Sequence, residues 1–155
     1  MGSDILKRLG IAKPRSERGF AQFAGIDLEK EIELTSEAWI LDGIKFPRVV
    51  REHQSWDCDF SNIVLSSYFR RKSESYDHYC DVVENHLGDF GEGPYEYGNV
   101  CLKEGDVVFD CGANMGLFSA VASRYGANVF AFEAVPEIIY GYLSKTADMN
   151  GNIRI

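Results

Sequence analysis

The stretch that decides the fold is Asp106–Glu133, which reads DVVFDCGANMGLFSAVASRYGANVFAFE. It opens with an apolar run, Val107–Cys111, of the kind found in strands that are buried on both faces of a sheet. A turn bounded by glycines, Gly112–Gly116, follows, and Leu117–Tyr125 has the apolar spacing of a helix. Asn128–Glu133 is a second short apolar strand. This order predicts a β-α-β unit.

The residues after Glu133 extend the same pattern. Pro136 suits the first turn of a helix, which we expect to run to about Ala147. Gly151 ends this helix, and Ile153–Ile155 begins a third strand. Strand, helix, strand, helix, strand is the first βαβαβ half of a doubly wound, Rossmann-like sheet, so the fold class is α/β.

The residues before this unit predict a helical region that contains one β-hairpin. Asp42 and Gly43 form a favoured two-residue turn between β-forming residues, so Trp39–Phe46 is a hairpin. Helical spacing marks three further segments: residues 1–30, 62–69 and 75–87. The Gly-rich stretch Gly88–Gly98 is a loop or linker. We therefore expect two parts, residues 1–92, whose role is unknown, and residues 93–155.

Composition narrows the class of protein. The 155 residues are 45% hydrophobic, which is typical of a globular chain, and the net charge is −8. Nine acids against one base between Glu74 and Asp106 would repel phosphate backbones, so we expect no nucleic-acid partner. With no membrane span, no secretory signal and no CxxC pair, we expect a cytoplasmic chain with reduced thiols and no metal site. Cys111 is expected to be a buried small hydrophobe.

The glycine turn and the acid that ends the second strand predict a nucleoside site. A turn that begins with glycine lets a ligand approach the backbone closely. Glu133 lies 21 residues beyond Gly112, where an acid accepts hydrogen bonds from two ribose hydroxyls in nucleoside-binding sheets. Asp110, at the end of the first strand, can meet a ligand ammonium group. It can instead cap the following helix.

The turn departs from the dinucleotide pattern G-x-G-x-x-G. Asn114 takes the place of the middle glycine, and the last glycine is absent, so a pyrophosphate would be crowded. Asn114 can either stabilise the turn in a left-handed conformation or touch the ligand. A ligand whose tail is an amino acid fits this turn better than one with two phosphates.

With DVVFDCGANMGLFS followed by VFAFEAVPE, residues 93–155 resemble the FkbM family of S-adenosylmethionine-dependent methyltransferases, which have the class I sheet. The resemblance implies S-adenosyl-L-methionine as cofactor and O-methylation of a small-molecule or glycan acceptor: a sugar, glycan or natural-product hydroxyl. It implies that Asp110 lies near the methionine part, Phe132 lines the adenine side and Glu133 holds the ribose. The cofactor loop would comprise Asp110, Gly112, Asn114 and Gly116. The family usually has Pro directly after the Glu, where this chain has Ala134.

No catalytic residue can be assigned from the sequence. His53, His78 and His86 are candidate bases by residue type alone. Because the chain stops at Ile155, we expect a truncated sheet that lacks most of the acceptor site. Its first strand would keep one unpaired edge and one sheet face would be poorly covered, which favours self-association. Two other functions stay open, a non-catalytic fragment or binding module and, with less support, a dinucleotide-binding oxidoreductase.

Overall fold

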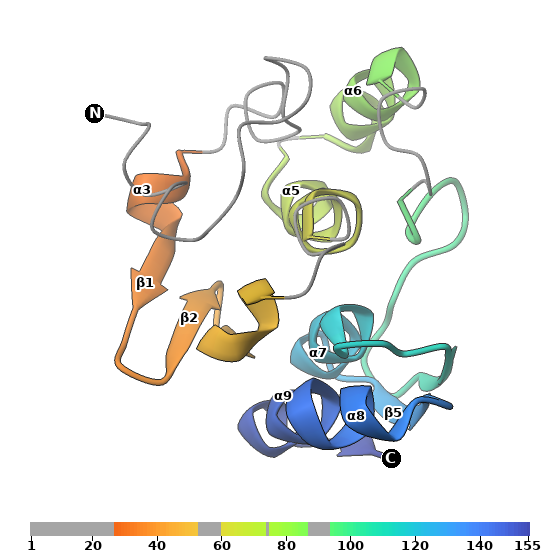
Figure 1. The fold of residues 1–155 in the computed structure, drawn as a ribbon. Helices are drawn as coiled ribbons and strands as arrows, with labels where there is room; N and C mark the ends of the chain where they lie inside the picture. Colours follow the sequence, from red (N-terminus) through yellow and green to blue (C-terminus); the bar gives the residue numbers. More distant parts are fainter. Residues whose placement is uncertain (1–26, 53–59, 74, 87–93) are drawn as a thin grey trace. The chain divides into compact units, whose positions relative to one another are not determined.

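The computed structural model describes residues 27–52, 60–73, 75–86 and 94–155. Over these residues the chain is mixed α/β, with one antiparallel and one parallel three-stranded sheet (Figure 1). The chain forms two compact units, residues 1–31 with 51–101 and residues 32–50 with 102–155. It crosses between the two units three times, after Glu31, after Val50 and after Cys101. The division expected at residues 92 and 93 stays a prediction.

The parallel sheet of the second unit follows the predicted βαβαβ order. Its strands lie in the order β4-β5-β6, and Phe109 of β4 is opposite Phe130 of β5. The helix expected after Pro136 is continuous and has a π-helical turn, η4, in its middle. The elements are β4 (Val107–Cys111), α7 (Leu117–Arg124), β5 (Asn128–Phe132), α8 (Pro136–Ile138), η4 (Ile139–Leu143), α9 (Ser144–Asn150) and β6 (Ile153–Arg154). The three predicted strands and two predicted helices are confirmed.

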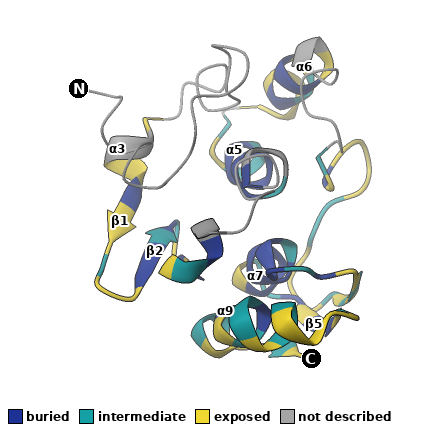
Figure 2. Cartoon of the chain, viewed as in Figure 1, coloured by how far each residue is buried: buried dark blue, intermediate teal, exposed yellow. Residues whose placement is uncertain are grey.

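Helices cover one face of this sheet. Helix α7 packs against all three strands and against α9. Val129 and Ala131 of β5 are buried there beside side chains from α7, η4 and the turns. The core residues are Ala113, Ala122, Ala127, Val129, Ala131 and Leu143, with Leu102, Val108 and Ile153 packed against them. Figure 2 shows the buried positions of α7 in dark blue.

The expectation that the first strand is buried on both faces is wrong. Val107 and Phe109 are 59% and 66% exposed, and Cys111 is exposed rather than buried. The physical reason is that alternate residues of a strand point to opposite faces, and the described helices pack on only one of them. A poorly covered sheet face was expected, and it is present in the described part of the chain.

The outer edge of β4 is unpaired among the described residues, because β4 pairs only with β5. The backbone N–H and C=O groups on that edge have no ladder partner there. Self-association through this edge stays a prediction.

The predicted hairpin is confirmed. β2 (Ala38–Leu41) and β3 (Ile44–Pro47) pair antiparallel, with Asp42 and Gly43 at φ 51° and 80°. Two successive positive φ values are those of the type I′ turn that Asp-Gly favours. A further strand that the sequence did not reveal, β1 (Ile32–Leu34), pairs with β2, and the 3₁₀ helix η1 (Arg48–Glu52) follows β3.

Strand β3 packs against α7 and α9. The side-chain amide of Asn150 in α9 pairs with both backbone groups of Lys45. It accepts the Lys45 N–H at 2.9 Å and donates to the Lys45 C=O at 2.7 Å. Arg124 of α7 donates to the Asp42 carbonyl at the hairpin turn. The hairpin therefore belongs to the same unit as the parallel sheet.

The described part of the first unit is mainly helical. It comprises α3 (Leu28–Glu31), the π-helical η2 (Phe60–Leu65), α5 (Ser66–Lys72) and α6 (Tyr76–His86). Glu96 is 1% exposed and accepts two hydrogen bonds from Arg71 of α5, at 2.6 and 2.8 Å. Tyr79 of α6 donates to the Glu96 carbonyl. These bonds hold the irregular segment 94–101 against α5 and α6. Most of the N-terminal segment expected to be helical, residues 1–26, lies outside the described residues.

Within the described ranges, no helix has both the length and the hydropathy needed to cross a membrane.

Candidate functional site

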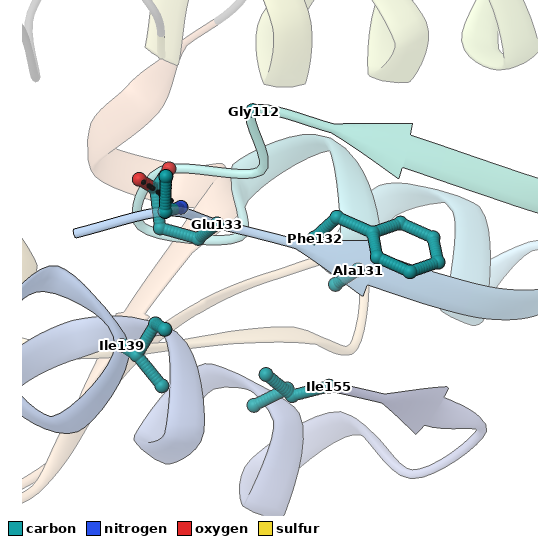
Figure 3. Close-up of a pocket in the computed structure, with 7 residues that line it drawn as sticks. Gly112, Ala131, Phe132, Glu133, Ile139 and Ile155 are labelled. Carbon is teal, nitrogen blue, oxygen red and sulfur yellow. Dashed lines mark hydrogen bonds between the residues drawn. The ribbon is translucent and has the colours of Figure 1, made fainter. Parts of the chain in front are cut away.

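A groove of about 510 Å³ lies at the carboxyl ends of the three parallel strands. Its volume is within the range of small-molecule pockets, roughly 300–1,000 Å³. The lining is largely apolar and consists of Gly112, Ala131, Phe132, Glu133, Ala134, Ile139 and Ile155. In Figure 3, Gly112 lies on one side of the end of β5, and Ile139 and Ile155 lie on the other. This is the edge at which parallel α/β sheets bind ligands.

The structure brings three of the six predicted site residues into this lining: Gly112, Phe132 and Glu133. The other three, Asp110, Asn114 and Gly116, are not part of it. They lie in β4 and in the turn between β4 and α7, so they adjoin the lining residue Gly112 in the chain.

Gly112 leaves the groove open at the start of the turn. Its φ is +82°, a conformation that side chains rarely adopt, and a Cβ placed there would have no atom within 4 Å. The backbone is therefore bare toward solvent, as the sequence predicts for a residue that a ligand approaches closely. Its N–H donates to the Phe132 carbonyl at 2.8 Å, which ties the turn to β5.

Gly116 has a packing role. A Cβ at this position would lie 2.7 Å from Leu143 Cδ1 and 3.2 Å from Thr146 Cγ2. Its φ of +80° adds a second reason for glycine. Thr146 is fully buried, and its Oγ1 donates to the Met115 carbonyl at 2.8 Å. The helix after β5 therefore supports the turn from behind.

Asn114 adopts the left-handed conformation that the sequence analysis left as one of its two roles, with φ 50°. Its backbone N–H donates to Glu133 Oε2 at 2.9 Å. Its side-chain Oδ1 is buried and has no hydrogen-bond partner within the described part of the chain. A buried unsatisfied acceptor costs free energy, so this atom has capacity for a donor supplied by a ligand.

The Glu133 carboxylate accepts three backbone N–H groups. Oε1 accepts those of Ala134 and Val135 at 2.8 and 2.9 Å, and Oε2 accepts that of Asn114. The Val135 N–H is the main cause that places the pKa of Glu133 below its ordinary value, with the other two acting in the same direction. A carboxylate offers about four lone-pair sites, so about one is left. Two ribose hydroxyls could be accepted only if at least one N–H bond were exchanged.

Asp110 lies on the helix-covered side of β4. Its Oδ2 accepts the hydroxyl of Ser119, in the first turn of α7, at 2.6 Å. The Ser119 backbone N–H also bonds this carboxylate, so Asp110 is tied to the first turn of α7. Burial raises the pKa of Asp110, and the nearby Glu133 charge adds to this, whereas the hydrogen bonds from Ser119 lower it.

Phe132 lies at the mouth of the groove on the uncovered face of the sheet. Its ring stacks on Phe109 with centroids 6.3 Å apart and is 51% exposed. Figure 3 shows the ring directed away from the Glu133 carboxylate. It offers a flat apolar surface beside the groove.

Four of the five N–H groups of the turn Gly112–Gly116 are bonded within the chain. The N–H groups of Gly112 and Ala113 donate to the Phe132 carbonyl, that of Asn114 to Glu133, and that of Gly116 to the Ala113 carbonyl. A dinucleotide loop presents its free amides to a pyrophosphate. Here those four donors already have partners, so the turn is poorly suited to two phosphates.

Sequence reasoning missed five residues of this region: Ala131, Ile139, Ile155, Thr146 and Ser119. The two isoleucines line the groove from the helix after β5 and from the residue after β6, and nothing local marks them. Ser119 carried a weak signal, because a serine in the first turn of a helix can bond an acid that precedes the helix.

The candidate bases receive no support from the groove. His78 is exposed on α6, His53 lies outside the described residues, and the His86 side chain is not described. Among the residues that the structure describes, no histidine lines the groove. Over the described residues, no cluster of three or more His, Cys, Asp or Glu side chains could hold a metal ion.

No protein-family model, no curated protein sequence and no solved structure matches this chain.

Proposed function

We propose that residues 102–155 bind S-adenosyl-L-methionine in the groove and that the chain is a methyltransferase of the FkbM type with a class I, Rossmann-like sheet. One observation carries the proposal. A groove of small-molecule size at the carboxyl edge of a parallel βαβαβ unit is lined by an open glycine, Gly112, and by the acid after the second strand, Glu133. This pairing is typical of sites for a nucleoside.

The donor set around the groove suits this nucleoside. Asp110 would face the ammonium of the methionine part, and the buried Asn114 Oδ1 has the capacity to accept a donor from the same part. Glu133 would hold the ribose after exchanging one backbone bond. Ile139, Ile155 and Phe132 offer apolar surface for the purine. The consumed turn amides argue for this ligand over a dinucleotide, and hence against the oxidoreductase alternative.

When bound, the cofactor supplies an electrophilic methyl group. The residues of this chain would orient the cofactor and exclude water from part of its surface. Such positioning supplies a large share of catalysis when the electrophile is already activated. We propose a hydroxyl of a sugar, glycan or related small molecule as acceptor, from the resemblance alone. Glu133 is the one titratable side chain in the groove lining that the structure describes. Since its carboxylate is engaged by backbone, no general base is assigned.

The engagement of the Glu133 carboxylate by backbone N–H groups favours a second candidate function, a non-catalytic nucleoside-binding module. Such a module would bind the cofactor and transfer no methyl group. It is distinguished from an enzyme by the rate of methyl transfer to hydroxyl acceptors, with binding measured separately.

Calorimetric titration with S-adenosylmethionine, S-adenosylhomocysteine and NAD tests the proposal. We expect the first two to bind and NAD to bind far more weakly. Asp110→Ala and Glu133→Ala should each weaken S-adenosylmethionine by about ten-fold or more, the loss of a charged hydrogen bond. Binding of NAD in preference to both sulfur nucleosides would refute the proposal.

A further inference from the structure

Two serines on α7, one turn apart, bind different partners. Ser119 is fully buried, and its Oγ donates to Asp110 Oδ2 at 2.6 Å. Ser123 is 7% exposed, and its Oγ is 3.0 Å from the carbonyl oxygens of Asn150 and Gly151. A helical serine often bonds the carbonyl four residues earlier instead. Ser119 has one hydroxyl donor, and it is directed at Asp110.

The elements packed around Asp110 bring few charges to it. The one charged residue of α7 is Arg124, at the far end of the helix, and it donates to the Asp42 carbonyl. Strand β5 carries no charged residue, and Glu133 directly follows it. The negative charge of Glu133 opposes ionisation of Asp110. Among the described residues, Ser119 is the residue that donates a hydrogen bond to the Asp110 carboxylate.

We propose that Ser119 is a positioning residue of the cofactor site, whose hydroxyl fixes the orientation of the Asp110 carboxylate for a ligand ammonium group. The proposal rests on the proposed function for the identity of that ligand. An ionised carboxylate has about four lone-pair sites, so the Ser119 bonds leave sites for the ligand. A protonated Asp110 would lose the charge that an ammonium requires.

The effect of Ser119 on the pKa of Asp110 agrees with the hydrogen bond between the two side chains. Burial raises the pKa of Asp110, and the bonds from Ser119 oppose that rise. Removing the hydroxyl therefore leaves a buried acid that protonates at higher pH. A hydrogen bond to a charged group contributes enough that its loss shifts a carboxyl titration by about one pH unit.

The test compares Ser119→Ala with Ser123→Ala, which removes a buried hydroxyl from the same helix without touching Asp110. The first readout is the titration of the Asp110 carboxyl carbon by NMR in the ligand-free protein. We expect the midpoint to rise by about one unit in Ser119→Ala and to stay unchanged in Ser123→Ala. Ser119→Thr, which keeps the hydroxyl, should restore the wild-type midpoint. An unchanged midpoint in Ser119→Ala, or an equal shift in both variants, would overturn the proposal.

If Ser119→Ala does not fold, Ser119→Cys replaces it, because a thiol has similar volume and is a much weaker donor. The same shift is expected, and its absence counts against the proposal.

The second readout is the affinity for S-adenosylmethionine as a function of pH. We expect Ser119→Ala to bind more weakly than Ser123→Ala at acidic pH, by up to about ten-fold once the pH lies below the Asp110 midpoints that the titration gives, with a smaller difference above them. Equal affinities across this range would overturn the positioning role. Wild-type protein that binds no S-adenosylmethionine would refute the proposed function. The carboxyl titration would still decide whether Ser119 controls Asp110.

Discussion

The Glu133 carboxylate accepts the backbone N–H of Asn114 at 2.9 Å, and this bond joins the turn after β4 to the turn after β5. Both turns lie at the carboxyl edge of the parallel sheet. The acid expected to receive ribose hydroxyls therefore also holds the glycine turn in place. A ligand that takes over this carboxylate must compete with the backbone of the protein itself.

Replacing Glu133 with Gln should destabilise the second unit in a pH-dependent way. Gln keeps an oxygen acceptor but turns an NH₂ toward backbone donors. We expect a loss of about 1 kcal/mol in the free energy of unfolding at pH 7, a small value because the carboxylate is partly exposed. The pKa of Glu133 lies below its ordinary value, so its contribution is full above about pH 4.3 and is lost as the pH falls through the lowered value.

Urea unfolding of wild type and Glu133→Gln at pH 7 and near pH 3 measures this effect. Glu137→Gln, an exposed acid four residues on, is the matched control and should change little. A difference from wild type that does not shrink on acidification would contradict the account.

Ala134→Pro should free one lone pair of Glu133. Ala134 donates its N–H to Glu133 Oε1 at 2.8 Å, and proline has no N–H. Proline is also the residue usual after this acid in the family that the motif resembles. Since a ribose diol then meets less competition, we expect S-adenosylmethionine to bind a few-fold more tightly. Val135→Ala, which keeps its N–H, is the control for isothermal titration. Unchanged or weaker binding in a folded Ala134→Pro protein would argue against competition at Glu133.

The two glycines that bound the turn should respond differently to alanine. Gly116→Ala forces a Cβ to 2.7 Å from Leu143 Cδ1 and should cost about 1–3 kcal/mol of stability. Gly112→Ala meets no atom within 4 Å, so its cost is about 1–2 kcal/mol of backbone strain, and its Cβ enters the groove. Thermal unfolding should rank Gly116→Ala as the less stable variant. Ligand affinity per folded molecule should fall more for Gly112→Ala. The reverse ranking in both assays would contradict these roles.

The first unit should depend on the Arg71–Glu96 pair. The Glu96 side chain is 2% exposed, and that of Arg71 is 22% exposed. Glu96→Gln removes one charge and leaves the other partly buried, so we expect a loss of about 3 kcal/mol in the free energy of unfolding. The double variant Arg71→Met/Glu96→Leu, which removes both charges, should lose less than the single variant. Denaturant unfolding of the three proteins decides this, and a double variant less stable than Glu96→Gln would contradict it.

Local pattern was enough to predict the parallel unit. Val107–Cys111 and Asn128–Glu133 are short apolar runs, Leu117–Tyr125 has the apolar spacing of a helix, and glycines separate the three. The pattern could not show which faces are covered. Apolar residues such as Phe109 suggest burial, yet Phe109 is 66% exposed because the described helices pack on the other side. Nor could it show that Asn150 bonds Lys45, 105 residues earlier, which attaches the hairpin to this unit.

The sequence was enough to predict where the site lies, but it did not reveal the hydrogen bonds within the site. Gly112 and Glu133 are recognisable because a tight turn and a strand-end acid leave local signs. That the Glu133 carboxylate is engaged by three backbone N–H groups depends on the turn geometry at Ala134 and Val135, which composition does not encode. Thr146 and Ser119 were missed because a buried hydroxyl in a helix looks like any other small residue until its partner is known.

The most direct test of the central claim is a two-dimensional ¹H–¹⁵N NMR titration of the labelled protein with S-adenosylmethionine. The account predicts saturable shifts of the amides at Gly112, Ala134 and Ile155, which line the groove, and at Asn114, whose N–H bonds the lining residue Glu133. It predicts little change at Lys45 in the hairpin. Absence of shifts at ligand saturation, or shifts confined to residues outside the groove, would contradict it.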